Sequence, residues 1–407
     1  MQSYTAVDRP PRNTVRAATR TTQLSMEGAY DIAARVASIQ ASGRRIANLS
    51  IGEPSFATPG HIVEAGTRAL RDGATRYTPV PGIAALREAI AASLRLRGIS
   101  ANVDNVIVTP GAKPALFYAL LALVEPGDEV LIPDPGFPAY AAVTAFAGGT
   151  PVGYGNSAAS AGDVAEIISL ITPRTRVLVL NAPGNPAGAT FDATALERLA
   201  AIVEQHDLAV ISDECYGRLV YDGSDAATSI ASVPGLADRT IVVDSFSKTY
   251  AMTGWRLGFA LAPSRLTRTL TRLAVNGHSC TPDFVQRAGV AALTGSQGPL
   301  ARMRSELRGR RDVLVAALNA IPGISCSAPA GAFYAFADVS RAAAQRGQSA
   351  TEFSDWLLDE VRVAGVPGTA FGVRGDGHIR FSFAAPTDDI ALAIDRLQHA
   401  LATGAGR

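Results

Sequence analysis

The sequence predicts an α/β protein built around a doubly wound, largely parallel β-sheet. Five short apolar runs end near polar residues suited to a binding site, and helical stretches separate most of the runs. The runs end at Thr109, Ile132, Asn181, Asp213 and Asp244. Because the carboxyl ends of parallel strands meet at one edge of a sheet, these positions are expected to lie together, where open α/β sheets bind their ligands.

Length and composition indicate a well-buried globular protein of more than one domain. The chain has 407 residues, of which 47% are hydrophobic and 18% charged. A net charge of +1 gives no electrostatic reason to expect nucleic acid or an anionic membrane as a partner. The longest apolar stretch, residues 115–124, is well short of the ~20 residues of a membrane span, so no membrane partner is expected.

Cysteine and histidine usage argues against a metal site. The three cysteines, Cys215, Cys280 and Cys326, have no metal-ligand spacing, and neither have the five histidines. Scattered cysteines in odd number are typical of a reducing compartment, so a cytoplasmic protein is expected.

The first twenty residues contain four arginines and one acid, a composition that resembles an organellar transit peptide. Pro10 and Pro11 weaken the helical version of that interpretation, so a mobile N-terminal arm is preferred.

The first elements after the arm are a helix and a short strand. Residues 30–42 have helical spacing and stop at Gly43, a natural C-terminal cap. Residues 46–54 are predicted to form a short strand that runs into a turn at Gly52. Farther on, Tyr77 lies in a Pro/Gly-rich loop between two helices, where packing is the ordinary interpretation of a tyrosine.

Residues 106–114 are predicted to form a strand, a glycine turn and a helix that begins at Pro114, since proline favours the first helical positions. Backbone N–H groups at a helix start bind phosphate, and the helix dipole favours the anion. Gly111 permits close approach of a ligand to the backbone. The turn therefore makes Gly111, Ala112 and Lys113 candidates for an anion site.

Three further candidates follow later runs. Phe137 offers a flat apolar face for stacking, although it also suits a core position. Asn185 lies in the turn after the strand at residues 176–181. Asp213 ends the next strand and Tyr216 follows it; a carboxylate at this point either faces a ligand or caps a helix.

Lys248 is the most distinctive residue, because the chain has only one other lysine, Lys113, and every other basic residue that carries a fixed charge is arginine. Unlike arginine, lysine can lose its proton and attack a carbonyl carbon. A buried strand, residues 240–244, leads to Ser245, and Arg256 lies eight residues beyond the lysine. The hydroxyls and the arginine suit a phosphate, and the amine suits an imine bond.

The alternation of buried strands and helices stops after residue 284. An arginine-rich stretch, residues 301–319, is predicted to be a helix that links domains. Strand-like segments surround Phe333 and Ile379, with a helix at residues 350–361 between them. Arg380 lies in an alternating segment, so its side chain has a defined face, and without further information that face is expected to be solvent.

The segment SFSKTYAMTGWRLGFA, residues 245–260, resembles the cofactor-lysine segment of class I/II aminotransferases, which use pyridoxal 5'-phosphate (PLP). Six motifs follow the family's order from about Tyr30 onward. The resemblance implies fold type I: a three-layer, doubly wound PLP-binding large domain (residues 52–289) and a smaller α+β domain built from both termini (residues 25–51 and 290–407), after an arm at residues 1–24. It also implies that the run at residues 257–261 joins the sheet antiparallel.

The resemblance assigns roles to the candidate residues. Lys248 would hold PLP and move a proton, and Asp213 would pair with the pyridine nitrogen, the electron sink of the reaction. Phe137 would stack on the cofactor ring, and Asn185 and Tyr216 would contact its phenolic oxygen. The residues that would bind the phosphate are Gly111, Ala112, Lys113, Ser245, Arg256 and the partner subunit's Tyr77. Those that would contact the substrate are Gly52, Asn185 and Arg380. The loop of Asn185 departs from the family pattern at Ala187, where threonine is usual.

The implied activity is transfer of an amino group between an L-amino acid and a 2-oxo acid, in a homodimer with shared active sites. A PLP-dependent lyase, cyclase or oxidase on the same fold is the alternative, because the pocket selects the bond that PLP breaks. A regulator with an added DNA-binding domain is disfavoured, since the arm is too short for one. The substrate stays open: Lys113 is placed where some relatives contact an acidic side chain, and Tyr30 is a candidate to line the pocket.

Overall fold

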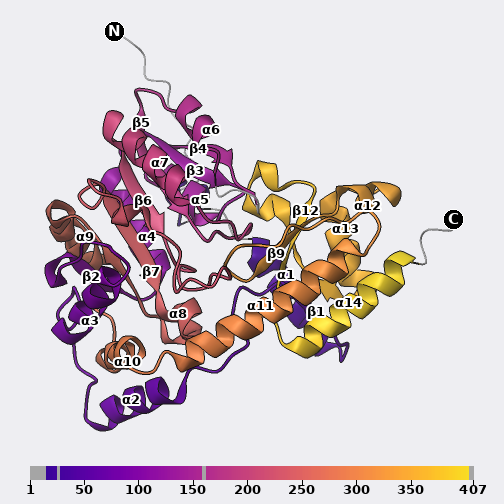
Figure 1. Ribbon diagram of the computed structural model, residues 1–407, viewed down its shortest axis with the longest axis horizontal. Helices are drawn as coiled ribbons and strands as arrows, with labels where there is room; N and C mark the ends of the chain where they lie inside the picture. The colour runs from indigo at the N-terminus through magenta and orange to yellow at the C-terminus, as the bar shows by residue number, and fades with distance from the viewer. Residues whose placement is uncertain (1–14, 25–27, 158–161, 403–407) are drawn as a thin grey trace.

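A computed structural model describes residues 15–24, 28–157 and 162–402. Its largest sheet has seven strands in the order β2-β8-β7-β6-β5-β3-β4 (Figure 1). Five of these strands correspond to the five apolar runs that the sequence singled out. The strands are β2 (Val106–Thr109), β3 (Glu129–Asp134), β4 (Thr150–Gly155), β5 (Thr175–Asn181), β6 (Ala209–Asp213), β7 (Thr240–Ser245) and β8 (Gly258–Leu261).

The strand directions confirm a doubly wound, mostly parallel sheet. The pairs from β7 to β4 are all parallel, whereas β8 is antiparallel to β2 and β7, as the resemblance implied. Asn181 pairs in register with Asp213, so the end of β5 lies directly beside the predicted site residue Asp213 on the adjacent strand.

The edge strand β4 was missed by the sequence analysis. Its six residues include Pro151, Gly153 and Gly155, and residues of these types are depleted in strands. Proline is tolerated here because the strand pairs on one side only, with β3.

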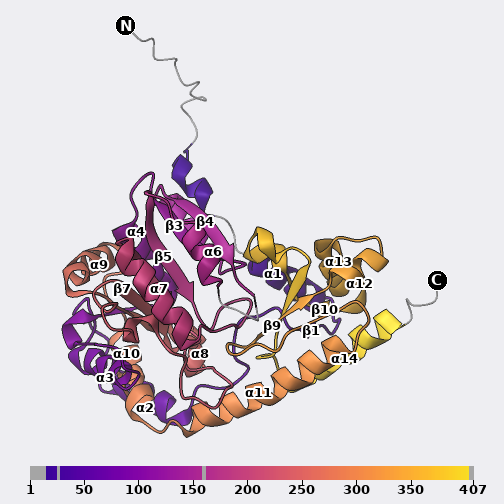
Figure 2. The ribbon, with the colours of Figure 1, turned by 45° about the horizontal axis from the view of Figure 1, so that its top comes forward.

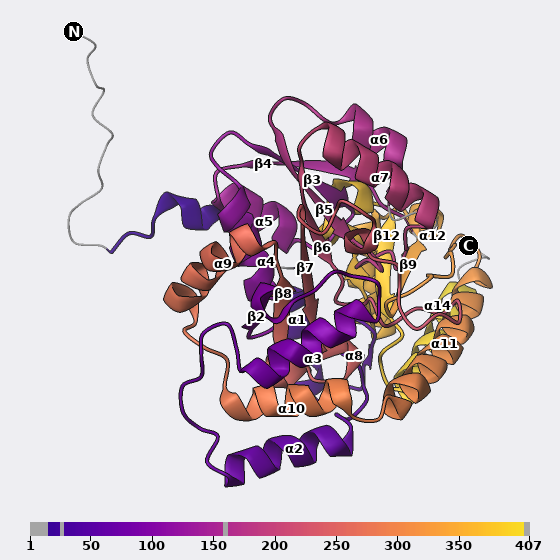
Figure 3. The same ribbon diagram turned by 60° about the vertical axis from the view of Figure 1, so that its left-hand side comes forward.

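Alternating side chains on the strands separate two apolar layers. Along β5, Val177 and Val179 pack into one core and Leu178 and Leu180 into the opposite one, as the two-residue period of a strand requires. Helices cover both faces, which gives the predicted three layers (Figure 3). One face carries α4 (Ala112–Leu123), α5 (Ala139–Phe146) and α9 (Ser264–Gly277); the other carries α3 (Ala84–Arg95), α6 (Val164–Ser169), α7 (Ala193–Gln205) and α10 (Asp283–Thr294), with α2 (Gly60–Arg71) packed on α10.

A smaller group of elements comes from both ends of the chain (Figures 1 and 2). The antiparallel sheet β11-β12-β9 and the parallel pair β1-β10 belong to it. The long helix α11 (Gly298–Asn319) runs from the large sheet's side of the molecule to this group. Its other members are α1 (Gly28–Ala41), β1 (Ala47–Asn48), β9 (Tyr334–Asp338), α12 (Ser340–Gln345), α13 (Ala350–Trp356), β10 (Val363–Ala364), β11 (Val366–Pro367), β12 (His378–Ser382) and α14 (Thr387–Ala402).

Several predicted boundaries shift. Helix α4 begins at Ala112 with Gly111 as its N-cap, two residues before the predicted start at Pro114. The predicted helix at residues 350–361 is α13 followed by a π-helical turn, Leu357–Val361. The exact domain boundaries stay a prediction, and most of the arm, residues 1–14, lies outside the described residues. None of the described helices is long and apolar enough to cross a membrane.

Candidate active site

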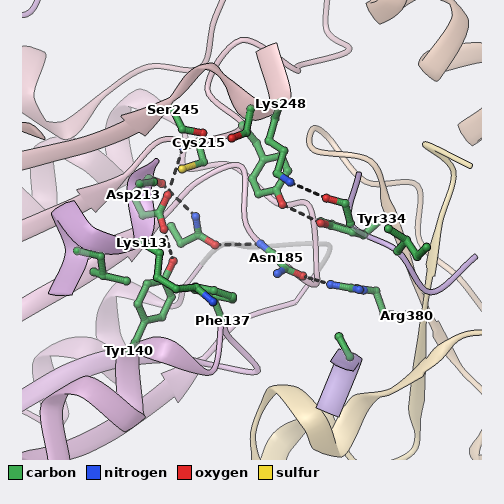
Figure 4. A pocket seen from close by; sticks show the side chains of 18 of the residues that line it. Lys113, Phe137, Tyr140, Asn185, Asp213, Cys215, Ser245, Lys248, Tyr334 and Arg380 are labelled. Carbon is green, nitrogen blue, oxygen red and sulfur yellow. Dashed lines mark hydrogen bonds between the residues drawn. The ribbon is translucent and has the colours of Figure 1, made fainter. Parts of the chain in front are cut away.

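A cavity of about 360 Å³ lies where the carboxyl ends of the central strands face the smaller group of elements (Figure 4). Its volume is within the range of small-molecule sites. Most of the residues that the sequence singled out line it, although they come from positions as far apart as 30 and 380. They are Tyr30, Gly52, Ala112, Lys113, Phe137, Asn185, Asp213, Tyr216, Ser245, Lys248, Arg256 and Arg380.

Lys248 lies in α8 (Phe246–Thr249), the single helical turn that follows β7. Its Nζ donates a hydrogen bond to the carbonyl oxygen of Gly52 (2.5 Å). Burial lowers the pKa of Lys248 to about 8, because an uncharged amine is favoured where water is excluded. The side chain can therefore lose its proton close to neutral pH, which a nucleophilic amine requires.

Asp213 ends β6 and is 7% exposed. Tyr140 of α5 donates its hydroxyl proton to Oδ2 of Asp213 (2.8 Å), and the backbone N–H of Cys215 donates to Oδ1 (3.2 Å). Burial raises the pKa of Asp213, and these two hydrogen bonds act in the opposite direction. The donors hold the carboxylate at the cavity wall and favour its ionised form.

Removing the Tyr140 hydroxyl is expected to lower the affinity of the site for a ligand whose cationic group pairs with Asp213. Tyr140→Phe keeps the ring packing but raises the pKa of Asp213 further, so the effect should grow as the pH falls. A hydrogen bond to a charged group contributes about 1.5 kcal/mol or more, which corresponds to roughly tenfold in affinity. The Kd of PLP, the cofactor that the sequence resemblance implies, is measured by fluorescence quenching between pH 6 and 8 to check this.

The matched control for Tyr140 is Tyr154→Phe. Tyr154 is equally buried and donates to the carbonyl oxygen of Val179 (2.7 Å), away from the cavity. Equal PLP affinities of the two variants across that pH range would contradict the assigned contact.

The predicted anion site lies at the start of α4. Gly111 has φ +95° and Arg256 has φ +54°, both in the left-handed region that residues other than glycine rarely adopt. The Arg256 guanidinium donates to the carbonyl oxygens of Thr253 (2.7 Å) and Pro110 (3.3 Å). A Cβ atom at position 111 would lie 2.5 Å from Nη2 of Arg256, so only glycine lets the arginine approach this helix start.

Arg380 is buried, contrary to the solvent-facing position that the sequence pattern alone favoured. It is 3% exposed, because the smaller sheet turns this face of β12 toward the large sheet. Its Nη1 donates to Oδ1 of Asn185 and its Nη2 to the carbonyl oxygen of Ser50, both at 2.8 Å. The guanidinium lies 4.3 Å from the ring centre of Tyr334 and 4.7 Å from that of Phe371. A buried, oriented guanidinium at a cavity wall suits bidentate binding of a carboxylate.

A chain of hydrogen bonds joins Arg380 to the sheet edge. The backbone N–H of Asn185 donates to Oδ1 of Asn181 (2.9 Å), and Nδ2 of Asn181 donates to the carbonyl oxygen of Asp213 (3.0 Å). Asn185 thus connects the arginine of the smaller sheet with the strand that carries the carboxylate (Figure 4).

The mouth of the cavity combines apolar groups with one cation. The Nζ atom of Lys113 lies 5.3 Å from the ring centre of Phe137 and 5.8 Å from that of Tyr30. Tyr30 is 58% exposed and Ile51 is 46% exposed, and both line the cavity. This rim can accept a side chain of the substrate.

Two predicted residues do not line the cavity. Gly111 is packed against Arg256, as described above, and its predicted contact with a phosphate stays a prediction. Tyr77 is 91% exposed and does not line the cavity of its own chain, so its predicted role stays a prediction.

Sequence reasoning missed several cavity residues, chiefly Tyr140 and Tyr334. The hydroxyl oxygens of Tyr334 and Tyr216 lie 2.7 Å apart, which is a hydrogen bond. Tyr140 had only a weak local signal: it follows Phe137 by three residues, but Phe137 precedes α5 and lies outside it. Tyr334 had none beyond its apolar strand. The other missed lining residues include Ser50, Asn181, Cys215 and Ser247.

With an amine and a carboxylate placed in this way at the carboxyl edge of a doubly wound sheet, the fold and the site define an enzyme of fold type I. Residues 44–397 match the family model described as aminotransferase class I and II, and this chain belongs to that family. It is an aminotransferase, an enzyme that moves an amino group between an amino acid and a 2-oxo acid.

Similar proteins agree with this assignment. An aspartate aminotransferase of Pyrococcus horikoshii is 40% identical over 361 residues, which cover 88% of this chain and 90% of that protein. An aromatic-amino-acid aminotransferase of Thermococcus litoralis is 38% identical, over 88% of this chain and 92% of its own. The solved structure of the aspartate aminotransferase from Rhizobium meliloti superimposes with a TM-score of 0.90 at 34% identity, covering 96% of this chain and 99% of that one.

Proposed function

We propose that this aminotransferase binds PLP in the cavity at the sheet edge, with Lys248 as its covalent partner. The residues present fit the group: a phosphate suits the N–H groups at the start of α4 and Arg256, and a flat ring suits the face of Phe137. The observation that carries the proposal is that Lys248 and Asp213 face one cavity, with Arg380 on its far side. When bound, PLP withdraws electrons from the substrate's Cα.

The proposed work of the protein groups is to hold charges and move one proton. Asp213, ionised with the help of Tyr140, pairs with the protonated ring nitrogen. Tyr216 and Asn185 contact the phenolic oxygen, and the Lys248 amine, with its lowered pKa, takes the proton from Cα as general base.

We propose that Arg380 binds the α-carboxylate of the substrate and thereby sets the orientation of Cα. Its position across the cavity from Lys248 supports this role, and a bidentate pair fixes the plane of the carboxylate. The carbonyl oxygen of Gly52 accepts a hydrogen bond from Lys248, and Gly52 lines the same cavity; both observations support the proposed backbone contact of Gly52 with the substrate.

We further propose a cytoplasmic homodimer whose sites are shared. The exposed Tyr77, which does not line its own cavity, is then supplied to the phosphate of the partner subunit. The described cysteines are free, as a reducing compartment requires.

Amino-group transfer is distinguished from other PLP reactions by its products. Purified enzyme is incubated with PLP, a panel of amino acids and 2-oxoglutarate. Formation of glutamate equal to the 2-oxo acid produced from the donor supports the proposal. Release of ammonia or of a cyclic product, without glutamate, would favour a lyase, cyclase or oxidase.

The Lys113 side chain is proposed to favour acidic donors. Lys113→Met, which removes the charge and keeps an unbranched side chain one atom shorter, is expected to lower kcat/KM for aspartate relative to alanine by about fivefold, the upper end for an exposed ion pair. The alanine reaction is the internal control. If the aspartate-to-alanine ratio does not change, the cation at the rim does not contact the substrate's side chain.

A further inference from the structure

Tyr334 links two of the proposed site groups. It is 1% exposed and lies on β9, where it pairs with Ser382 of β12, while Phe336 pairs with Arg380. Because residues two apart share a face of a strand, Tyr334 and Arg380 are on the same face of the smaller sheet. That face is turned toward the cavity (Figure 4).

The ring of Tyr334 faces the guanidinium of Arg380. The distance from the guanidinium carbon to the ring centre is 4.3 Å, within the range of a cation–π contact. Phe371 supplies a second ring at 4.7 Å. Two rings together with the acceptors of Asn185 and Ser50 define both the place and the plane of the guanidinium.

The hydroxyl of Tyr334 faces a different group, the hydroxyl of Tyr216 (2.7 Å). Burial raises the pKa of both hydroxyls, so each keeps its single proton. If Tyr216 donates its proton to the phenolic oxygen of the cofactor, the proton between the two tyrosines must come from Tyr334. Tyr334 then fixes the direction in which Tyr216 donates.

Gly52 shows how closely this hydroxyl is held. A Cβ atom at position 52 would lie 2.5 Å from the Tyr334 oxygen, so only glycine fits beside it. The carbonyl of the same glycine accepts the hydrogen bond from Lys248.

We propose that Tyr334 is a positioning residue with two separable actions: its ring orients Arg380 toward the substrate's carboxylate, and its hydroxyl orients the proton of Tyr216 toward the cofactor. This inference rests on the proposed function. It predicts that two substitutions at one position have different consequences, because Phe removes only the hydroxyl and Met removes the ring as well.

The chain offers a matched control in Tyr221. It is buried in the same apolar core, its hydroxyl donates to the carbonyl oxygen of Ala332, and Arg311 lies 4.9 Å from its ring centre. It does not line the cavity. Tyr221→Phe and Tyr221→Met therefore report the cost of the same changes outside the site.

Two measurements on PLP-loaded protein separate the actions. The first is the pH at which the absorbance of the bound cofactor changes, which should rise when a donor to the phenolic oxygen is lost. The second is the Kd of 2-oxoglutarate without an amino donor, read from the same absorbance. Tyr334→Phe should raise the transition pH but change that Kd less than twofold. Tyr334→Met should also raise the Kd of 2-oxoglutarate roughly tenfold.

A double-mutant cycle tests whether the hydroxyl acts through Tyr216. Tyr334→Phe should cause no further rise of the transition pH in a Tyr216→Phe background. The hydroxyl action is overturned if the rises of the transition pH caused by Tyr334→Phe and Tyr216→Phe are fully additive. It is also overturned if Tyr334→Phe changes the transition pH no more than Tyr221→Phe does. Unchanged binding of 2-oxoglutarate by Tyr334→Met overturns the ring action. Should that variant not fold, Tyr334→Leu, which also removes the ring, replaces it with the same criterion.

The proposed function fails separately from this inference. If the wild-type protein gains no visible absorbance with PLP, both the proposed function and the role of Tyr334 are contradicted. A wild-type protein that binds PLP normally, with Tyr334 variants equal to the Tyr221 controls, ends only the role of Tyr334.

Discussion

Lys248→Ala is expected to lower turnover by about 10⁴-fold or more, at the upper end of what a positioned proton-transfer group contributes. The variant should also lose the visible absorbance that wild-type protein gains with PLP. The reason is that the amine has two proposed tasks, covalent attachment and proton transfer, and Lys113, the only other lysine, lies across the cavity near Phe137. Absorbance spectra and single-turnover kinetics measure the two losses.

Lys248→Arg separates the charge of the side chain from its chemistry. Arginine keeps a cation but holds its proton at any accessible pH, so this variant should be as inactive as Lys248→Ala. Borohydride reduction of PLP-treated Lys113→Met, followed by peptide mapping, should still find the adduct at position 248. Retained turnover in Lys248→Arg, or an adduct at position 113 in the wild type, would contradict the assignment.

Arg380→Lys is expected to lower kcat/KM for amino acids by roughly 10²-fold and Arg380→Ala by roughly 10³-fold, since truncating one partner of a buried charge pair costs about 2–5 kcal/mol. Lysine keeps the charge but cannot reproduce the planar fork held by Asn185, Ser50 and the two rings. Steady-state kinetics with several donors measures the effect.

A primary amine without a carboxylate is the matched substrate control for Arg380. It has no group for the guanidinium to bind, so its reaction should change far less than that of the corresponding amino acid. The thermal unfolding of each variant without PLP shows whether the fold tolerates the substitution. An equal loss for amine and amino acid in folded protein would mean that Arg380 supports the structure and does not bind the carboxylate.

Local patterns predicted the part of the site that the large sheet carries. Strand ends are fixed by short apolar runs and by the turns that follow them, so Asp213, Asn185 and Lys248 were placed at one edge before any contact was known. The edge strand β4 was missed for the corresponding reason, because its glycines and proline obscure the pattern.

The large sheet, the edge at which its strands end and the lysine at that edge all follow from patterns within a few residues of each other, so the amino-acid sequence was enough to predict them. The burial of Arg380 and the approach of Tyr334 and Tyr140 to the cavity are visible only in the folded chain. The hydrogen bonds concerned join Arg380 to Asn185 across 195 residues, Tyr334 to Tyr216 across 118 and Tyr140 to Asp213 across 73. The packing of the smaller sheet against the large one, and of α5 against its face, creates them, and no local pattern specifies which side chains then meet.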